Sequence, residues 1–338
     1  MIIQEDFSLK QLNTLGVDAK AKHFIELEDE NDLLEYLDSK EAPKRNPMIL
    51  GGGSNVLFTK NYDGTILRYP AKGIKIIEEN SSYVFVESSA GELWDDLVTF
   101  CIEKNFYGIE NLSLIPGEVG AAPIQNIGAY GVELKDVFDN LEGYFLDTKE
   151  KRKFSKTDCR FGYRDSIFKK ELKNKFLITK VVLRLSKEKK FNLSYKALQE
   201  QLGDINPDKL TIYEVAATVR EIRESKLPDP KKIGNAGSFF KNPEIGSTQL
   251  AQIQKKYPDI TFYKTGDDSF KIPAGWLIEK CGYKGKRIGN IGCYEKQALV
   301  IVNYGNAGGE EIRAFAEKIR NAVNYGFNIK LDYEVSII

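Results

Sequence analysis

The stretch "PGEVGAAPIQNIGAYG", Pro116 to Gly131, combines four glycines and three alanines with no Lys or Arg. The region without basic residues extends from Lys104 to Lys135, in a chain in which 49 of 338 residues are basic. If this segment binds an anion, we expect it to use backbone N–H groups. Glycine suits that task because it adopts positive φ and lets a ligand approach the main chain without a Cβ in the way.

A second segment, "ILGGGSNVLF" at Ile49 to Phe58, has three glycines, Ser54 and Asn55 between two apolar runs. It lacks the Lys of a Walker loop and the G-x-G-x-x-G spacing of a Rossmann turn. One glycine cluster is more often a tight turn than a ligand site. Two clusters in one chain favour a shared ligand that carries a diphosphate.

The length and charge of the chain narrow the class of protein. A chain of 338 residues exceeds what one hydrophobic core usually supports, which predicts two or three domains. Because 49 basic residues balance 49 acidic ones, binding to nucleic acid or to an anionic membrane is disfavoured. The start "MIIQEDFSLKQLN" carries charges where a signal peptide needs an apolar core, and no run approaches the ~18 apolar residues of a membrane span. We therefore expect a cytoplasmic protein.

Cysteine and histidine are too sparse for several chemistries. The four cysteines lack ligand spacing, which predicts buried, reduced thiols and no metal site. A Ser/His/Asp relay would depend on His23, the only histidine, at the expected start of a strand in "HFIEL". We expect that histidine to be structural. The cysteines are Cys101, Cys159, Cys281 and Cys293.

Hydrophobic periodicity indicates an α+β chain without repeats. Short alternating runs predict strands, and apolar residues at helical spacing predict helices over 30–39, 92–105, 211–226 and 310–326. Thr211 and Glu214 have capping-box spacing, and we expect Gly326 to end the last helix as its C-cap. The stretch 328–338 alternates strictly, which predicts a final strand.

Seven motifs occur in a fixed order: "LGGGSNVLF", "PGEVGAAPIQNIGAYG", "YRDSIFK", "SKLPDP", "GNAGSFFKNP", "AGWLIEKCG" and "QALVIVN". Together, from about Asn13 to Val335, they make the chain resemble the UDP-N-acetylenolpyruvoylglucosamine reductase family, flavoenzymes of bacterial cell-wall synthesis. The resemblance implies an α+β fold with two subdomains of the vanillyl-alcohol-oxidase FAD-binding type and a third, α+β substrate-binding domain. The implied boundaries are 1–69, to which strand 328–338 returns, 70–227 and 228–327.

The cofactors implied by the resemblance are non-covalent FAD and, as hydride donor, NADPH. FAD contacts are expected from both glycine segments and from one arginine on the helix at 211–226. The implied residues are Gly51, Gly52, Gly53, Ser54, Asn55, Pro116, Gly117, Gly120, Ala121, Ala122, Asn126, Gly128, Ala129, Tyr130 and Arg223.

The reaction of the family reduces an enolpyruvyl ether to a lactyl ether, giving UDP-N-acetylmuramate for peptidoglycan. Flavin N5 gives hydride to C3 of the substrate, and an acid protonates C2. The resemblance assigns the proton to Ser238, stabilisation of the enolate-like carboxylate to Arg164, and a second stabilising or acidic role to Glu334. Each residue also has a structural alternative: a turn contact for Arg164, a turn cap for Ser238 and a solvent-facing carboxylate for Glu334.

Substrate contacts implied by the resemblance involve Tyr163, Tyr195, Lys226, Asn242, Lys271 and Gln297. Tyr195 stands in the loop that distinguishes type I members. Lys226 follows Arg220 and Arg223 at helical spacing, so the helix dipole explains it equally well. Ser336 departs from the family, which often has Arg there.

Two other functions stay open. Another FAD oxidoreductase of the same fold would keep both glycine segments but would not need "GNAGSFFKNP". A catalytically idle nucleotide-binding module would tolerate changes at Arg164 and Ser238. We expect a monomer whose partners are the UDP-sugar and NADPH.

Overall fold

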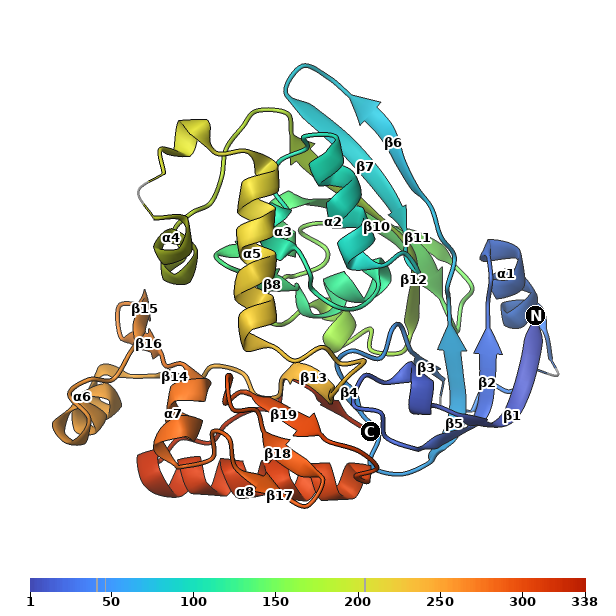
Figure 1. Ribbon diagram of the computed structural model, residues 1–338. Coiled ribbons are helices and arrows are strands. Elements are labelled where there is room, and N and C mark those ends of the chain that lie inside the picture. Colours follow the sequence, from blue (N-terminus) through green and yellow to red (C-terminus); the bar gives the residue numbers. More distant parts are fainter. Residues whose placement is uncertain (41, 46, 204) are drawn as a thin grey trace. The chain divides into compact units, whose positions relative to one another are not determined.

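The computed structural model describes residues 1–40, 42–45, 47–203 and 205–338 (Figure 1). They form two compact units, each with its own hydrophobic core. The first unit contains Met1–Phe7, Ala21–Gly52 and Asp63–Glu224. The second contains Ser8–Lys20, Gly53–Tyr62 and Ser225–Ile338. The division into three domains stays a prediction.

The first unit begins with a four-stranded sheet in the order β1-β2-β5-β3, beside helix α1. Asp29 caps α1, because its Oδ1 accepts hydrogen bonds from Asn31 N (2.8 Å) and Asp32 N (2.9 Å). The strand β3, at one edge of the sheet, is followed by Leu50 and then by Gly51. The bounds are β1 Ile2–Ser8, β2 Lys20–Glu26, α1 Glu30–Asp38, β3 Met48–Ile49 and β5 Tyr62–Arg68.

A five-stranded antiparallel sheet, in the order β11-β10-β12-β7-β6, forms the rest of that unit with its helices. Alternate residues of the central strands are buried in the core, among them Val84, Val86, Leu183 and Leu185. The strands are β6 Ile74–Glu79, β7 Tyr83–Ser89, β8 Gly128–Ala129, β9 Val132–Glu133, β10 Phe138–Phe145, β11 Lys151–Ser155 and β12 Phe176–Ser186. The helices are α2 Trp94–Glu103, α3 Leu134–Val137, α4 Lys196–Leu202 and α5 Ile212–Lys226.

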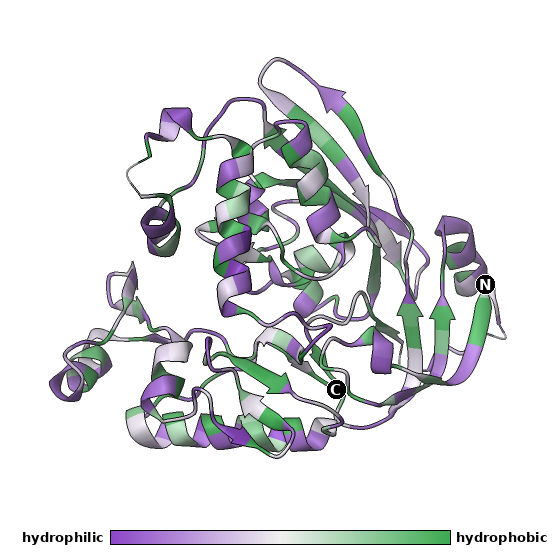
Figure 2. Ribbon diagram, in the orientation of Figure 1, coloured by the Kyte–Doolittle hydropathy of each residue, from purple (hydrophilic) through white to green (hydrophobic). Residues whose placement is uncertain are grey.

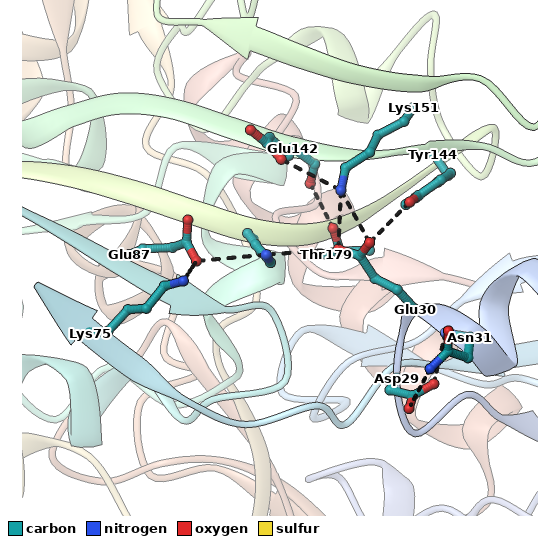
Figure 3. Close-up of polar contacts among 10 residues, drawn as sticks. Asp29, Glu30, Asn31, Lys75, Glu87, Glu142, Tyr144, Lys151 and Thr179 are labelled. Atoms are coloured by element: carbon teal, nitrogen blue, oxygen red, sulfur yellow. Dashed lines mark hydrogen bonds and ion pairs between the residues drawn. The ribbon is translucent and has the colours of Figure 1, made fainter. Parts of the chain in front are cut away.

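Charged side chains of alternating sign cross this sheet (Figure 3). They come from all five strands and are Lys75, Glu87, Lys180, Glu142 and Lys151. Glu30 of α1 joins them, because Lys151 Nζ lies 3.1 Å from its Oε2 and the Tyr144 hydroxyl donates to the same oxygen at 3.0 Å. Burial opposes ionisation of Glu30, but these hydrogen bonds lower the pKa of its carboxyl. The ladder therefore ties α1 to the sheet.

The second unit packs α8 against a four-stranded sheet in the order β13-β19-β18-β17. Figure 2 shows hydrophobic and hydrophilic residues alternating along α8, whose Ile312, Phe315, Ile319 and Val323 are buried. The strands are β4 Val56–Leu57, β13 Gly234–Ser238, β14 Glu244–Ile245, β15 Tyr263–Gly266, β16 Ser269–Lys271, β17 Arg287–Ile288, β18 Ile291–Cys293, β19 Val300–Asn303 and β20 Ser336–Ile337. The helices are α6 Ser247–Lys256, α7 Ala274–Lys280 and α8 Gly309–Phe327.

Two sequence predictions about the end of the chain are wrong. Gly326 is not the C-cap, because the apolar repeat continues to the buried Phe327 and Asn328 adopts the left-handed conformation with φ 51°. The expected strand over 328–338 is regular only at β20, which pairs in parallel with β4. Burial does alternate there, but the segment changes hydrogen-bond partners before reaching β20, so no long ladder forms.

Other local predictions are confirmed. The capping box forms, with Thr211 N donating to Glu214 Oε2 (2.7 Å) and Glu214 N donating to Thr211 Oγ1 (3.2 Å). Three of the four free cysteines are buried, and burial raises the pKa of the Cys159 and Cys293 thiols to about 12. The expected position of His23 is wrong, because β2 begins at Lys20 and His23 lies in the middle of the strand.

Among the described residues, no group of three or more His, Cys, Asp or Glu side chains is arranged to hold a metal ion. In the same part of the chain, no helix combines the length and apolar character that crossing a membrane requires.

Candidate functional site

The two glycine segments meet in the first unit. An ideal Cβ on Gly51 would lie 3.1 Å from Glu118 Oε2 and 3.6 Å from Ala121 Cβ. One on Gly52 would lie 3.6 Å from the Gly117 Cα. Segments distant in the sequence therefore lie side by side and form one glycine-rich surface, the glycine surface, where little side-chain bulk separates the two main chains.

Gly53, in the second unit, is needed for a close backbone contact. Its φ is +62°, and a Cβ there would lie 1.9 Å from the Leu12 carbonyl oxygen. Thr14 N donates to Gly53 O at 3.1 Å, which holds the two turns together. The following residues are half-buried Ser54 and Asn55.

The second glycine segment is held in place by hydrogen bonds to other parts of the first unit. It forms a 3₁₀ helix, Val119–Gln125, in which Gly120 N donates to Ala90 O at 2.8 Å. Asn126 follows with φ 46°, and its amide nitrogen donates to Glu133 Oε2 (3.1 Å) and Gly162 O (3.0 Å). The predicted FAD contact Asn126 is thus a buried residue that shapes the turn. Pro116 and Ala121 are exposed, and Ala122 is buried.

Positive charge reaches this segment from elsewhere in the chain, while the expectation that its backbone N–H groups bind an anion stays a prediction. Arg164 Nη2 donates to Gly128 O at 2.7 Å. Arg223 Nε donates to Leu114 O at 3.2 Å, and the Arg164 charge acts on the guanidinium of this half-buried residue. Burial lowers the pKa of Arg223, against the attraction of Tyr130 and Asp95.

Arg68, which sequence reasoning did not single out, contacts the glycine surface at Glu118. Its Nη2 is 3.3 Å from Oε1 of the buried Glu118, and its Nη1 is 3.0 Å from Glu26 Oε2. Burial raises the pKa of the Glu118 carboxyl, while the Arg68 charge opposes that shift. The arginine therefore offsets the only acidic residue between Pro116 and Gly131.

Three bulky residues of this region have left-handed backbone conformations. Their φ values are 60° at Leu114, 48° at Tyr130 and 52° at Arg164. A non-glycine residue in this region costs about 1–3 kcal/mol and persists only where the surrounding structure enforces it. Such strain concentrates at functional sites, which supports a site at this segment.

Two asparagines connect the loop that carries Tyr195 to the second glycine segment. The amide nitrogen of Asn111, a fully buried residue, donates at 2.8 Å to both Tyr130 O and Asn192 O. Asn192 Nδ2 donates to Gly131 O at 2.9 Å. The Tyr195 and Tyr130 rings then meet edge to face, with centroids 5.2 Å apart. Sequence reasoning missed both asparagines, because neither stands in a recognisable motif.

In the second unit, a bulge places Ser238 at the end of β13. The pairing register with β19 shifts between Asn235 and Ser238, and Gly237 has φ +65°. Asn235 Oδ1 accepts a hydrogen bond from Gly237 N at 3.0 Å. The bulge leaves the predicted proton donor half-buried next to the fully buried Phe239.

Glu334 lies beside this strand. Its backbone N donates to Phe239 O at 3.0 Å, and its carbonyl oxygen accepts from Asn55 Nδ2 at 3.2 Å. The structure thus brings two predicted catalytic positions, Ser238 and Glu334, onto neighbouring backbone segments. Ser336 N donates to Asn55 O at 3.1 Å, so Asn55 also binds the chain beyond Glu334.

Two of the predicted substrate residues converge at the start of α7. Asn242 Oδ1 accepts from Ala274 N at 2.9 Å, and Gln297 Oε1 lies 3.0 Å from where a Gly275 Cβ would be. Among the other predicted substrate residues, Lys271 Nζ lies 3.5 Å from Glu244 Oε1. The Arg164 guanidinium carbon lies 5.3 Å from the centroid of the Tyr163 ring. Lys226 is exposed at the end of α5.

The fold and the joined glycine segments define a flavoprotein. Residues 21–147 match the FAD binding domain family, and the glycine surface with Arg164 and Arg223 suits an anionic dinucleotide. The predicted FAD cofactor and the α+β fold of vanillyl-alcohol-oxidase type are therefore confirmed.

Relatives identify the family more closely. Residues 229–338 match the C-terminal domain of UDP-N-acetylenolpyruvoylglucosamine reductase. The reductase of that name from Flavobacterium johnsoniae is 47% identical over 339 residues, covering 100% of both chains. The one from Pseudomonas aeruginosa is 43% identical, covering 99% of this chain and 98% of its own. The chain belongs to the UDP-N-acetylenolpyruvoylglucosamine reductase family of enzymes.

A solved structure agrees with this fold. The crystal structure of the Thermus caldophilus reductase superposes with a TM-score of 0.68 at 22% identity, covering 100% of this chain and 99% of its own.

Proposed function

We propose that this reductase uses NADPH to reduce UDP-N-acetylglucosamine enolpyruvate to UDP-N-acetylmuramate, a peptidoglycan precursor. The proposal is supported by full-length similarity to reductases of that name together with one structural observation. That observation is the attachment of the Glu334 backbone to the residue after Ser238, in the unit that contains the reductase-specific C-terminal domain.

Bound FAD supplies the hydride chemistry, which carries electrons from NADPH to C3 of the substrate. The chain holds it through the two glycine segments, Tyr130 and Arg223. Arg164 orients and stabilises the substrate carboxylate, on which negative charge grows during reduction. A fixed cation there favours the transition state over the ground state.

Ser238 holds the proton that C2 receives. A serine hydroxyl is a weak acid, so its contribution rests on proximity and on the rigid bulge at Gly237. Glu334 acts as the second stabilising or acidic group. The UDP part of the substrate contacts Tyr195, Lys226, Asn242 and Gln297, with Tyr163 and Lys271 as weaker contributors.

The remaining parts of the proposal concern organisation. FAD lies in subdomains 1–69 and 70–227, and substrate enters under a third domain, 228–327. The enzyme acts as a cytoplasmic monomer. Gel filtration with light scattering tests the monomer.

An anaerobic spectral titration tests the proposed reaction. The purified protein is first treated with NADPH and then with the UDP-enolpyruvyl sugar. Flavin absorption that bleaches and then returns supports the donor and the acceptor together. Bleaching without return contradicts the substrate and favours another FAD oxidoreductase. A flavin that does not bleach contradicts NADPH as donor and favours a catalytically idle module.

A further inference from the structure

We propose that Tyr333, together with Glu317 and Arg320 of α8, positions Glu334 beside Ser238. This inference deepens the proposed function and rests on it for the role of Glu334. The question arises because Glu334 precedes β20 and belongs to no regular strand. A side chain on irregular backbone needs other contacts to keep one orientation.

The backbone around Glu334 is attached to the chain after Ser238 by a short antiparallel pairing. Tyr333 forms a bridge with Phe240, and Glu334 N donates to Phe239 O at 3.0 Å. Lys241 N donates to Asp332 O at 2.9 Å. These bonds fix the register, but so short a ladder is weak by itself.

The Tyr333 ring strengthens the attachment. It stacks on Phe240 with centroids 5.5 Å apart and an interplanar angle of 24°. It also meets Phe239 edge to face at 5.8 Å. Both phenylalanines are fully buried, so Tyr333 rests on a rigid surface directly after Ser238.

The Tyr333 hydroxyl connects this aromatic group to α8. It donates to Glu317 Oε1 at 2.6 Å, and Arg320 Nη1 donates to the same oxygen at 2.7 Å. Arg320 also donates from Nε to Leu331 O at 2.9 Å, and its guanidinium lies 4.6 Å from the Tyr333 ring centroid. Anchoring Tyr333 against α8 therefore fixes the backbone to which the Glu334 side chain is attached.

Burial raises the pKa of Tyr333 to about 12, so the hydroxyl remains a hydrogen-bond donor throughout the neutral range. The anchor is thus expected to hold under all conditions in which the enzyme is assayed.

The test compares Tyr333→Phe with Tyr325→Phe in the FAD-loaded full chain. Tyr333→Phe keeps the stacked ring and removes the hydrogen bond to Glu317. Tyr325 also comes from α8, but it is 96% exposed and serves as the matched control. In stopped-flow experiments, we expect Tyr333→Phe to leave flavin reduction by NADPH within about twofold of wild type. Reoxidation by the UDP-enolpyruvyl sugar should slow by roughly tenfold, because small displacements of a reacting group are costly.

A double-substitution cycle tests whether Tyr333 acts through Glu334. In a Glu334→Gln background, Tyr333→Phe should cause little further loss of reoxidation rate. If Tyr333→Phe slows reoxidation as much in the Glu334→Gln background as it does in the wild-type background, the inference is overturned. Arg320→Lys, which keeps the charge but removes the Nε hydrogen bond to Leu331 O, should show the same dependence on Glu334.

Hydrogen–deuterium exchange separates this inference from the proposed function. Peptides covering 329–338 should exchange faster in Tyr333→Phe than in wild type, and the same in Tyr325→Phe as in wild type. If the sugar fails to reoxidise wild-type flavin, the proposed function is wrong, and faster exchange still supports the anchor. If the peptides covering 329–338 exchange at the wild-type rate in Tyr333→Phe, the inference is overturned.

Discussion

Replacing Gly53 by Ala tests how tightly the first glycine segment is built, and Gly16→Ala is the matched control. Both glycines have left-handed backbone, with φ +62° and +66°, and both lie in the second unit. The left-handed conformation costs an alanine about 1–2 kcal/mol at either position. The stiffening of the unfolded chain by alanine is also common to both, so it cancels in the comparison.

The two positions differ in the space around them. A Cβ on Gly16 meets nothing within 4 Å, whereas one on Gly53 would lie 1.9 Å from Leu12 O. Because real Cβ atoms essentially never approach closer than 3.0 Å, the backbone must move by more than 1 Å (3.0 minus 1.9 Å). Overpacking of this kind costs about 1–3 kcal/mol, and the hydrogen bond from Thr14 N to Gly53 O is expected to break, costing about 1 kcal/mol more.

We therefore expect Gly53→Ala to lower the free energy of unfolding by about 2–4 kcal/mol more than Gly16→Ala does. Urea unfolding of both variants, followed by circular dichroism, measures this difference. Flavin retained after desalting gives a second readout, which should fall only in Gly53→Ala. Equal unfolding midpoints in the two variants would refute the reasoning, because the clash and the hydrogen bond it breaks are expected at Gly53 and not at Gly16.

Three further predictions concern the site and the sheet. Ser238→Ala should leave flavin reduction by NADPH near normal but slow reoxidation by the sugar about 10²-fold or more in stopped-flow experiments; equal losses in both would contradict a proton donor. Asn192→Asp, which loses the donor to Gly131 O, should raise KM for the sugar by about tenfold with kcat less affected, and an unchanged KM would contradict a loop-positioning role. The pKa of the Glu30 carboxyl is lower in the folded protein than its ordinary value of 4.5. The ionised carboxylate therefore stabilises the fold above pH 4.5, and this stabilisation is lost as the pH falls through the pKa of the folded protein. Glu30→Gln should therefore be less stable than wild type to urea near pH 7 and equal to it at strongly acid pH, and a difference independent of pH would refute this.

Local patterns in the sequence predicted local structure well. The capping box at Thr211 formed because its two partners are three residues apart and need no tertiary contact. The end of α8 was mispredicted because the glycine rule competes with burial. Phe327 is buried, which extends the helix past Gly326, and Asn328 tolerates the left-handed conformation that ends it.

Predictions failed where the decisive partner lies far along the chain. The alternation over 328–338 correctly marks Leu331 and Val335 as buried, but it cannot show that the backbone is divided between the chain after Ser238 and strand β4. The same limit applies to Asn111, whose two acceptors are 19 and 81 residues away. Such contacts leave no periodic signal in the sequence.

Packing limits where charge can lie at the glycine surface. At a glycine that packs against other backbone, a basic side chain would need a Cβ where none fits; at Gly120, for example, it would lie 2.6 Å from Ala90 Cβ. Arg164 and Arg223 instead bring positive charge to the segment from other elements. The absence of Lys and Arg between Lys104 and Lys135 is thus no sign that the segment avoids anions. Positive charge is supplied by side chains whose own Cα atoms lie outside the segment.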